Sequence, residues 1–182
     1  MVSKINQNDF ELTPFNYSNL ESIRITGTVY RHKERLKIKY ILSGDLSTII
    51  IPQPHKTLAR QYDLWEHTCF EFFLRIKDTA KYWEFNLSPS GKWNVFRFLN
   101  YRENIAEELK IDRLPFSVER REESLRVELN FDLNKIKVAQ ESFNLAIATV
   151  VEDKHKQLSY WALTHPKTEA DFHHPDSFAL DL

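Results

Sequence analysis

Glycine and sulfur-containing residues are scarce in this sequence. Of its 182 residues, three are Gly, one is Cys and one is Met. Three glycines are too few to make a glycine-rich phosphate-binding loop plausible. The lone Cys69 excludes an internal disulfide and a cysteine-based structural zinc site. Neither of these two usual supports of a secreted domain is available, so we expect a reducing environment.

Long apolar runs and an excess of one charge are also missing. No window approaches the ~18 consecutive apolar residues of a membrane-spanning helix, and residues 1–10 lack the apolar run of a signal peptide. Lys plus Arg number 25 and Asp plus Glu number 26, giving a net charge of −1. Such a balance provides no global field to attract nucleic acid or anionic lipid. We therefore expect a cytoplasmic protein that binds neither nucleic acid nor membranes.

Aromatic residues, in contrast, are abundant. They make up 13% of the chain and include four Trp, within an ordinary globular mix of 42% hydrophobic and 28% charged residues. Aromatic area must supply much of the core or of a binding site. The length suits one domain, and no linker, repeat or low-complexity segment divides it. We therefore treat residues 1–182 as a single domain.

Short segments with period-two alternation predict most of the secondary structure. The expected strands are residues 23–31, 36–42, 69–76, 81–87, 93–99, 116–119, 125–131, 145–151 and 158–163. Residues 102–112 carry Ile105 and Leu109 four positions apart and predict a short surface helix, and residues 55–61 one or two helical turns. Because an antiparallel sheet must bury its apolar face, the pattern predicts an all-β, antiparallel two-sheet β-sandwich of immunoglobulin-like or jelly-roll type with one or two short surface helices.

Strand parity places a polar surface on the central meander. Phe70, Phe72, Leu74, Ile76, Trp83, Phe85 and Leu87 point into the core in this assignment, together with Phe96 and Phe98. The opposite face then carries Glu71, Arg75, Glu84, Asn86 and Arg97 among aromatic residues. Hydrogen-bonding groups beside flat rings suit a neutral polyhydroxylated ligand. Ion pairing of Glu and Arg across neighbouring strands explains the same pattern without a ligand.

Other chemistry has weaker support in the sequence. Residues 164–176 contain three His and two Asp, but their spacing matches no recurrent zinc pattern, so we expect a structural loop and no metal. Cys69 lies on a strand dense in Phe and is expected to be buried and inert. Glu71 and Glu84 share one face of adjacent strands, as a glycosidase acid and base would. Any two strands that carry Glu give such a pair, so we do not expect an enzyme.

Several blocks of the sequence resemble a known family. Residues 64–74 resemble the Trp-led strand of family 9 carbohydrate-binding modules and of the wider DOMON-like superfamily. Residues 82–91 look like the family's next strand, and residues 129–133 like a later strand and turn. Residues 160–161 and 172–180 are similar to its closing block. The resemblance implies a DOMON-like β-sandwich over residues 1–182.

The resemblance also implies a site in which a sugar lies between two aromatic side chains. Matching by position places Trp65 and Phe172 in that clamp, with Trp161 in the closing block. Glu71 matches a strand acid of the family, while Glu84 and Asn86 match positions where the family often has an amide and an Arg. Phe172 replaces a second Trp, and Thr68 stands where Asp is common. Haem-binding relatives use a Met and a His, but the only Met is Met1, so no cofactor is expected.

Two hypotheses about function follow. The first is a non-catalytic domain that binds a sugar or glycan-like small molecule; its ligand-binding residues would be Trp65, Glu71, Glu84, Asn86, Arg97, Trp161 and Phe172. The alternative is a protein-protein interaction or homodimerisation module that uses the same aromatic face. The identity of the ligand and the oligomeric state are not specified by the sequence.

Overall fold

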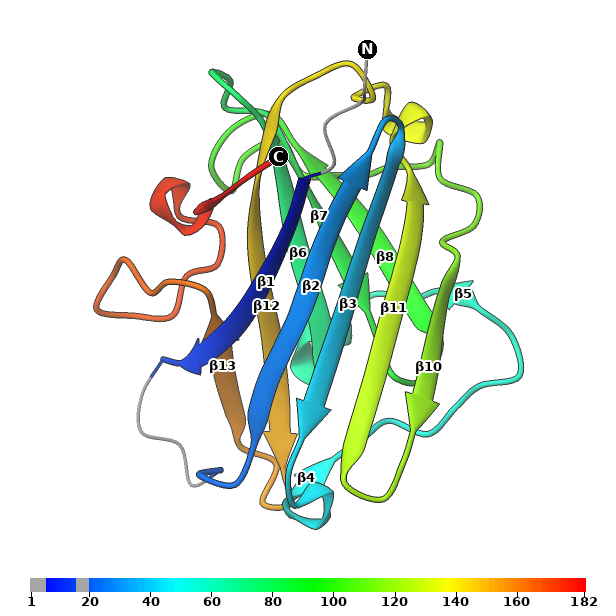
Figure 1. The fold of residues 1–182 in the computed structure, drawn as a ribbon, viewed down its shortest axis with the longest axis vertical. Helices are drawn as coiled ribbons and strands as arrows, with labels where there is room; N and C mark the ends of the chain where they lie inside the picture. Colours follow the sequence, from blue (N-terminus) through cyan, green and yellow to red (C-terminus); the bar gives the residue numbers. More distant parts are fainter. Residues whose placement is uncertain (1–5, 16–19) are drawn as a thin grey trace.

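The computed structural model describes residues 6–15 and 20–182, which form an all-β structure with short 3-10 helices (Figure 1). The strands are β1 (Asn6–Pro14), β2 (Arg24–His32), β3 (Arg35–Ser43), β4 (Ile49–Ile50), β5 (Ala59–Arg60), β6 (Cys69–Ile76), β7 (Tyr82–Leu87), β8 (Lys92–Phe98), β9 (Ala106–Glu107), β10 (Phe116–Arg120), β11 (Ser124–Asp132), β12 (Phe143–Asp153), β13 (Leu158–Ala162) and β14 (Leu180–Asp181). The 3-10 helices are η1 (Leu46–Thr48), η2 (Leu64–Glu66), η3 (Leu133–Ile136) and η4 (Pro175–Ser177). In this described part of the chain, no helix is both long and apolar enough to cross a membrane.

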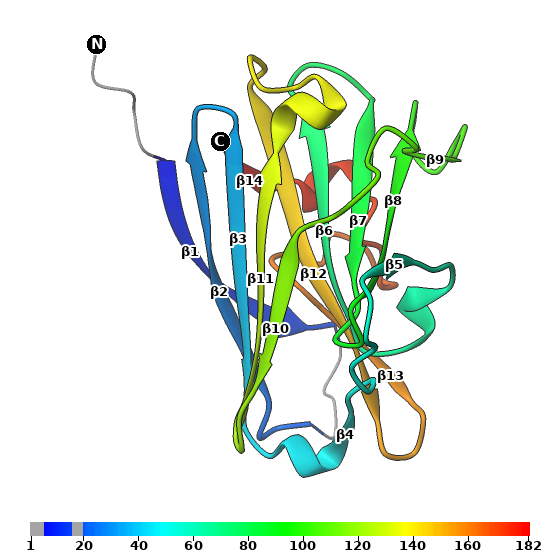
Figure 2. The same ribbon diagram turned by 90° about the vertical axis from the view of Figure 1, so that its right-hand side faces the viewer.

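The strands form one continuous sheet that curls over on itself. Its order is β10-β11-β3-β2-β1-β13-β12-β6-β7-β8-β5, with β4, β9 and β14 paired alongside. Strand β1 joins the two halves, because Leu12 pairs with Ile25 of β2 while Thr13 pairs with Ala162 of β13. The halves then face each other (Figure 2). The all-β prediction is confirmed, but the strands belong to one curled sheet and two separate sheets are not seen. The sheet is antiparallel only in part, because β5 runs parallel to β8.

Each strand expected from alternation is present, with ends shifted by two residues at most. The expected surface helix at residues 102–112 is wrong: the segment contains turns and strand β9, which pairs with β8. Ile105 and Leu109 remain 59% and 73% exposed, so no apolar helix face has a surface to pack on. Residues 55–61 also form no helix. Contacts with distant residues hold this segment instead: the Arg60 guanidinium, for example, lies 4.4 Å from the centre of the Trp93 ring.

The main core lies between the two halves of the curled sheet. Phe72 and Phe85 stack with ring centroids 4.2 Å apart, and Phe131 of β11 meets Phe85 edge-on at 5.1 Å. These contacts join β6 and β7 to the opposite half. A second, smaller cluster lies on the outer face of β6, β7 and β8, where tail residues Phe172 and Phe178 cover strand aromatics. The sheet therefore packs aromatic residues on both of its faces in this region.

We predict that Phe72→Ala lowers the free energy of unfolding by about 3–5 kcal/mol, because it removes a fully buried ring and leaves a cavity between the halves. Urea denaturation followed by circular dichroism measures the loss. Lys37→Ala, on the exposed side of β3, is the control and should change stability by less than about 0.5 kcal/mol. Equal stabilities for the two variants would contradict this description of the core.

Candidate functional site

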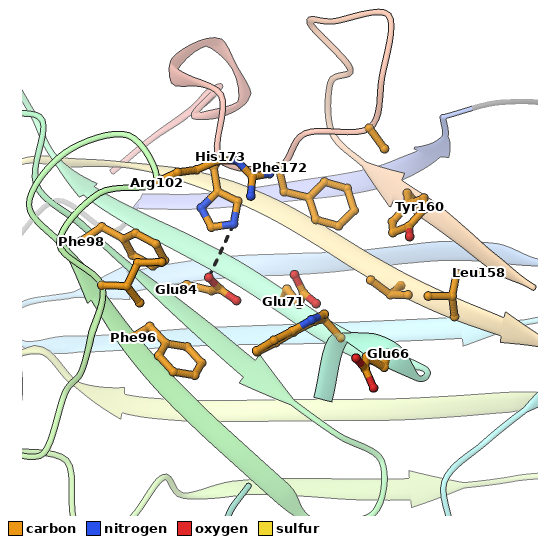
Figure 3. A pocket seen from close by; sticks show the side chains of 14 residues that line it. Glu66, Glu71, Glu84, Phe96, Phe98, Arg102, Leu158, Tyr160, Phe172 and His173 are labelled. Atoms are coloured by element: carbon orange, nitrogen blue, oxygen red, sulfur yellow. Dashed lines mark ion pairs between the residues drawn. The ribbon is translucent and has the colours of Figure 1, made fainter. Parts of the chain in front are cut away.

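An open pocket of about 550 Å³ lies on the outer face of the sheet. Residues of β6, β7, β8 and β12 contribute to it, and η2, β13, the loop after β8 and the carboxyl-terminal tail complete its wall. The aromatic members of the wall are Trp65, Phe96, Phe98, Tyr160 and Phe172. The charged and titratable members, most of them labelled in Figure 3, are Glu66, Glu71, Glu84, Arg102 and His173.

The two segments expected to meet at a site do contribute to the same pocket. Trp65 belongs to η2, is 38% exposed, and lies edge-on to Phe96 at 6.0 Å between centroids. Phe172 comes from the tail and is 9% exposed, with its ring centroid 6.0 Å from that of Tyr160. Both side chains therefore present ring surface to one open volume, although more than a hundred residues separate them in the sequence.

Two buried carboxyl groups lie among these rings. In the β6–β7 ladder, Glu71 pairs with Asn86 and Phe73 pairs with Glu84, so the two acids are diagonal neighbours on one face. Glu84 accepts a hydrogen bond from the Asn86 amide at 2.7 Å. Glu71 is only 3% exposed, and its Oε1 makes no hydrogen bond within the described residues. An acceptor left unsatisfied in this way needs a water molecule or a ligand group.

Burial changes the proton affinity of both acids. It raises the pKa of Glu71 well above its usual range, and the neighbouring Glu84 charge raises it further. Burial also raises the pKa of Glu84 to about 7, against the opposing effects of the Asn86 hydrogen bond and the Arg102 charge. Glu71 therefore favours the protonated form, in which a carboxyl both donates and accepts hydrogen bonds, and Glu84 does so below about pH 7.

His173 is a pocket residue that the sequence analysis missed. Its Nε2 lies 3.6 Å from a Glu84 oxygen (Figure 3). The Tyr82 hydroxyl accepts from the Arg102 backbone N–H and forms a second hydrogen bond, of 2.9 Å, with His173 Nδ1. Burial, followed by the Arg102 charge, lowers the pKa of His173 to about 3. The imidazole is therefore neutral and gives Glu84 no positive charge.

A charged network holds the tail against the pocket rim. Asp171 accepts from Arg102 Nη2 at 2.9 Å and from the Tyr101 hydroxyl at 2.5 Å, and Lys167 lies 3.2 Å away. Burial acts to raise the pKa of Asp171, but these partners together lower it to about 2. Asp171 therefore stays ionised and keeps Arg102 paired, which fixes the adjacent Phe172 and His173 over the sheet.

Of the site residues expected from the sequence, Trp65, Glu71, Glu84 and Phe172 line the pocket. Asn86 does not; it is fully buried and donates a hydrogen bond to Glu84. Trp161 was expected at the site, but it is buried in the main core and donates to Ser159, while its neighbour Tyr160 faces the pocket.

The expected position of Arg97 is wrong because the parity assigned to β8 is reversed. Trp93 and Val95 belong to the main core, whereas Phe96 and Phe98 face the pocket. Arg97 pairs with Trp83 in the ladder and so lies on the core side, away from the pocket. Both faces of this strand are apolar, so its alternation carried no information about direction.

The other candidate residues have structural surroundings. Cys69 is fully buried, and burial raises the pKa of its thiol well above the usual range. Thr68 donates to the Ile50 carbonyl and accepts from the Glu152 backbone N–H, which ties together the elements around η2. His174 has a different role from His173: its side chain caps the start of η4 by accepting a hydrogen bond from the Asp176 backbone N–H. Within residues 6–15 and 20–182, no three His, Cys, Asp or Glu side chains are grouped as a metal site requires.

Comparisons with known proteins find similarity only at the level of structure. No family model and no curated protein matches the chain. A solved protein from Bacteroides uniformis ATCC 8492, provisionally described as carbohydrate-binding, has a TM-score of 0.62 at 12% identity over 91% of this chain and 83% of that one. A family 9 carbohydrate-binding module from Caldicellulosiruptor kristjanssonii in complex with glucose scores 0.52 at 12% identity, covering 92% and 80%. Its complex with cellotriose scores 0.51 at 10% identity, covering 98% and 77%.

These likenesses define the class of fold. At 10–12% identity they show architecture alone, and that architecture is the one found in carbohydrate-binding modules. The chain therefore has a carbohydrate-binding-module-like fold, in agreement with the resemblance seen in the sequence. The wider DOMON-like assignment stays a prediction.

We predict that Glu84→Gln becomes more stable relative to the unsubstituted protein as pH rises from 5 to 8. Folding raises the pKa of Glu84 from an ordinary 4.5 to about 7. The contribution of Glu84 to the stability of the unsubstituted protein is therefore complete below about pH 4.5 and is lost as the pH rises through 7, whereas Gln does not titrate. The relative change should be on the order of 3 kcal/mol. Urea denaturation at each pH measures it.

Stability must be compared between variants at each pH, because the contribution of His173 to stability changes with pH in the opposite direction to that of Glu84. Its pKa falls on folding, so its contribution is lost as pH drops. Glu128→Gln, on the exposed side of β11, is the matched control. A stability difference between Glu84→Gln and the unsubstituted protein that does not change with pH would show that Glu84 is not a buried acid.

Proposed function

We propose that this protein is a non-catalytic carbohydrate-binding domain that holds a saccharide in the outer pocket. Trp65 and Phe172 would contact the flat faces of the sugar ring, while Glu71 and Glu84 would bind its hydroxyl groups. The observation that carries the proposal is the combination, in one open pocket, of rings from two distant segments with a buried carboxyl oxygen that finds no hydrogen-bond partner in the part of the chain that the structure describes. We also propose that the domain belongs to the DOMON-like superfamily.

The size and chemistry of the pocket support this proposal. A volume of about 550 Å³ falls within the range of roughly 300–1,000 Å³ typical of small-molecule sites. Apolar ring surface covers the C–H faces of a sugar, and protonated carboxyls both donate to and accept from its hydroxyls. The sequence-distant Trp65 and Phe172 give the pocket the pair of rings that such binding needs.

The comparisons support the same class of ligand. The family 9 modules that share this fold were solved with glucose and with cellotriose, a monosaccharide and a short oligosaccharide. The matched regions cover nearly all of this chain. We therefore favour sugars of one to three rings as the first ligands to test.

A binding role makes no demand on the ionisation of the two acids. Glycoside hydrolysis needs one carboxyl that donates a proton and a second that is ionised as nucleophile or base. Burial disfavours the ionised form of both Glu71 and Glu84. A binding site has no such requirement, because a neutral carboxyl is a complete partner for a hydroxyl group.

We predict that the protein binds glucose or a cello-oligosaccharide and that Trp65→Ala weakens this binding about tenfold. The loss corresponds to one aromatic contact of roughly 1–1.5 kcal/mol. Isothermal titration calorimetry measures the dissociation constants. Tyr30→Ala, on the outer side of β2 and away from the pocket, is the aromatic control and should bind as the unsubstituted protein does.

Two results would contradict the proposed function. One is the absence of binding to any saccharide at millimolar concentration, or binding that Trp65→Ala leaves unchanged. The other is a dimer, detected by gel filtration with light scattering, whose interface buries Trp65 and closes the pocket. That second result would favour the protein-interaction alternative.

A further inference from the structure

Carboxyl groups are the most numerous polar side chains of the pocket wall. Glu66, Glu71 and Glu84 all line it, whereas its described lining residues include no Lys, Asn, Gln, Ser or Thr, and its neutral donors are the Trp65 indole and the Tyr160 hydroxyl. The one guanidinium, that of Arg102, is bound to Asp171 at 2.9 Å. The Nε2 atom of His173 already lies 3.6 Å from a Glu84 oxygen. A ligand that supplies donors and positive charge therefore fits this wall better than one that supplies further acceptors.

Glu71 marks where such a ligand would bind. Its side chain is almost fully buried, lines the pocket, and leaves Oε1 without a hydrogen-bond partner among the described residues. Glu84, diagonal to it, receives one hydrogen bond from Asn86, and the His173 imidazole 3.6 Å away is neutral. The two acids thus lie next to each other in the wall of one open pocket, and within residues 6–15 and 20–182 neither forms an ion pair with a Lys or Arg side chain.

The surrounding rings add a second attraction for a cation. Aromatic faces attract ammonium groups through the ring quadrupole, most strongly for Trp. Trp65 and Phe96 meet edge-on in the pocket wall, and Phe172 lies near Tyr160. An ammonium group bonded to the Glu71 and Glu84 carboxyls would lie within an aromatic enclosure.

We propose that the pocket selects a saccharide that carries a protonated amine, that is, an amino sugar, over the uncharged sugar of the same size. The ammonium group would donate to Glu71 and Glu84, and the sugar ring would lie against Trp65 and Phe172. This inference rests on the proposed carbohydrate-binding function and specifies its ligand class.

The proposal has a definite proton balance. The amine arrives with its proton, and the carboxyl that binds it gives up its own proton to solvent, so that an ion pair forms inside the pocket. Binding therefore releases protons, and affinity rises as pH rises through the acidic range while the amine stays charged. The titratable and charged groups facing Glu71 and Glu84 from the packed elements are Tyr40, Glu66, Cys69, Tyr82, Arg102, Asp171 and His173.

The test compares three sugars by calorimetry at pH 7: glucose, glucosamine and N-acetylglucosamine. The last has the same substituted position as glucosamine but no charge. We expect glucosamine to bind at least about tenfold more tightly than either neutral sugar, with proton release seen as a dependence of the heat on the buffer's ionisation enthalpy. The preference should shrink at pH 5.5, because the carboxyls hold their protons more firmly there while the amine stays charged.

Variants assign the preference to the two acids. Glu71→Gln and Glu84→Gln should each reduce the advantage of glucosamine to within about threefold of glucose. The control Glu128→Gln removes the same charge at a distant exposed position and should keep the full preference. If a pocket variant fails to fold, the three-sugar comparison and its pH dependence on the unsubstituted protein decide the question.

The possible outcomes separate the inference from the function on which it rests. Equal affinities for glucose and glucosamine would overturn the amino-sugar inference and leave the proposed function standing. No binding of any of the three sugars would overturn both. Methylamine binding as tightly as glucosamine would show a cation site without sugar recognition, which would overturn the proposed function. Tight binding of glucosamine that the two Gln variants weaken would support both.

Discussion

The packing of the carboxyl-terminal tail on the outer face of β6, β7 and β8 is the interaction on which the pocket depends. A sheet face normally exposed to water here carries rings such as Phe73 and Tyr82, and the tail covers them with Phe172 and Phe178. Asp171 secures the tail through its charged partners. Without this cover the outer face would be a flat aromatic surface, and no enclosed volume would exist beside Trp65.

The same cover explains the electrostatics of the site. Charged side chains are rarely buried without a partner, because removing them from water is costly. Glu71 and Glu84 lie under the rings that the tail and η2 bring over the sheet, and burial shifts their proton affinity toward the neutral form. His173, also buried and neutral, provides no compensating charge. The protein thus maintains a destabilising arrangement in a pocket lined by five aromatic side chains, which is the pattern expected of a functional site.

Much of the fold follows from the sequence because strand side chains alternate between faces. That rule placed Phe70 and Phe72 in the core and Glu71 on the opposite face. It failed at Val95 and Phe96, where both faces are apolar and only tertiary packing selects the direction. The linking strand β1 was missed because periodicity describes single strands and says nothing of how one strand pairs with both halves of a sheet. That His173 joins the pocket also depends on tail packing, which local sequence does not encode.

A crystal structure of the protein with a bound saccharide tests the central claim most directly. The account predicts a sugar ring between Trp65 and Phe172, with polar groups of the sugar within hydrogen-bond distance of Glu71 and Glu84. A sugar found elsewhere on the molecule, or a second copy of the chain packed into the pocket in its place, would contradict the account.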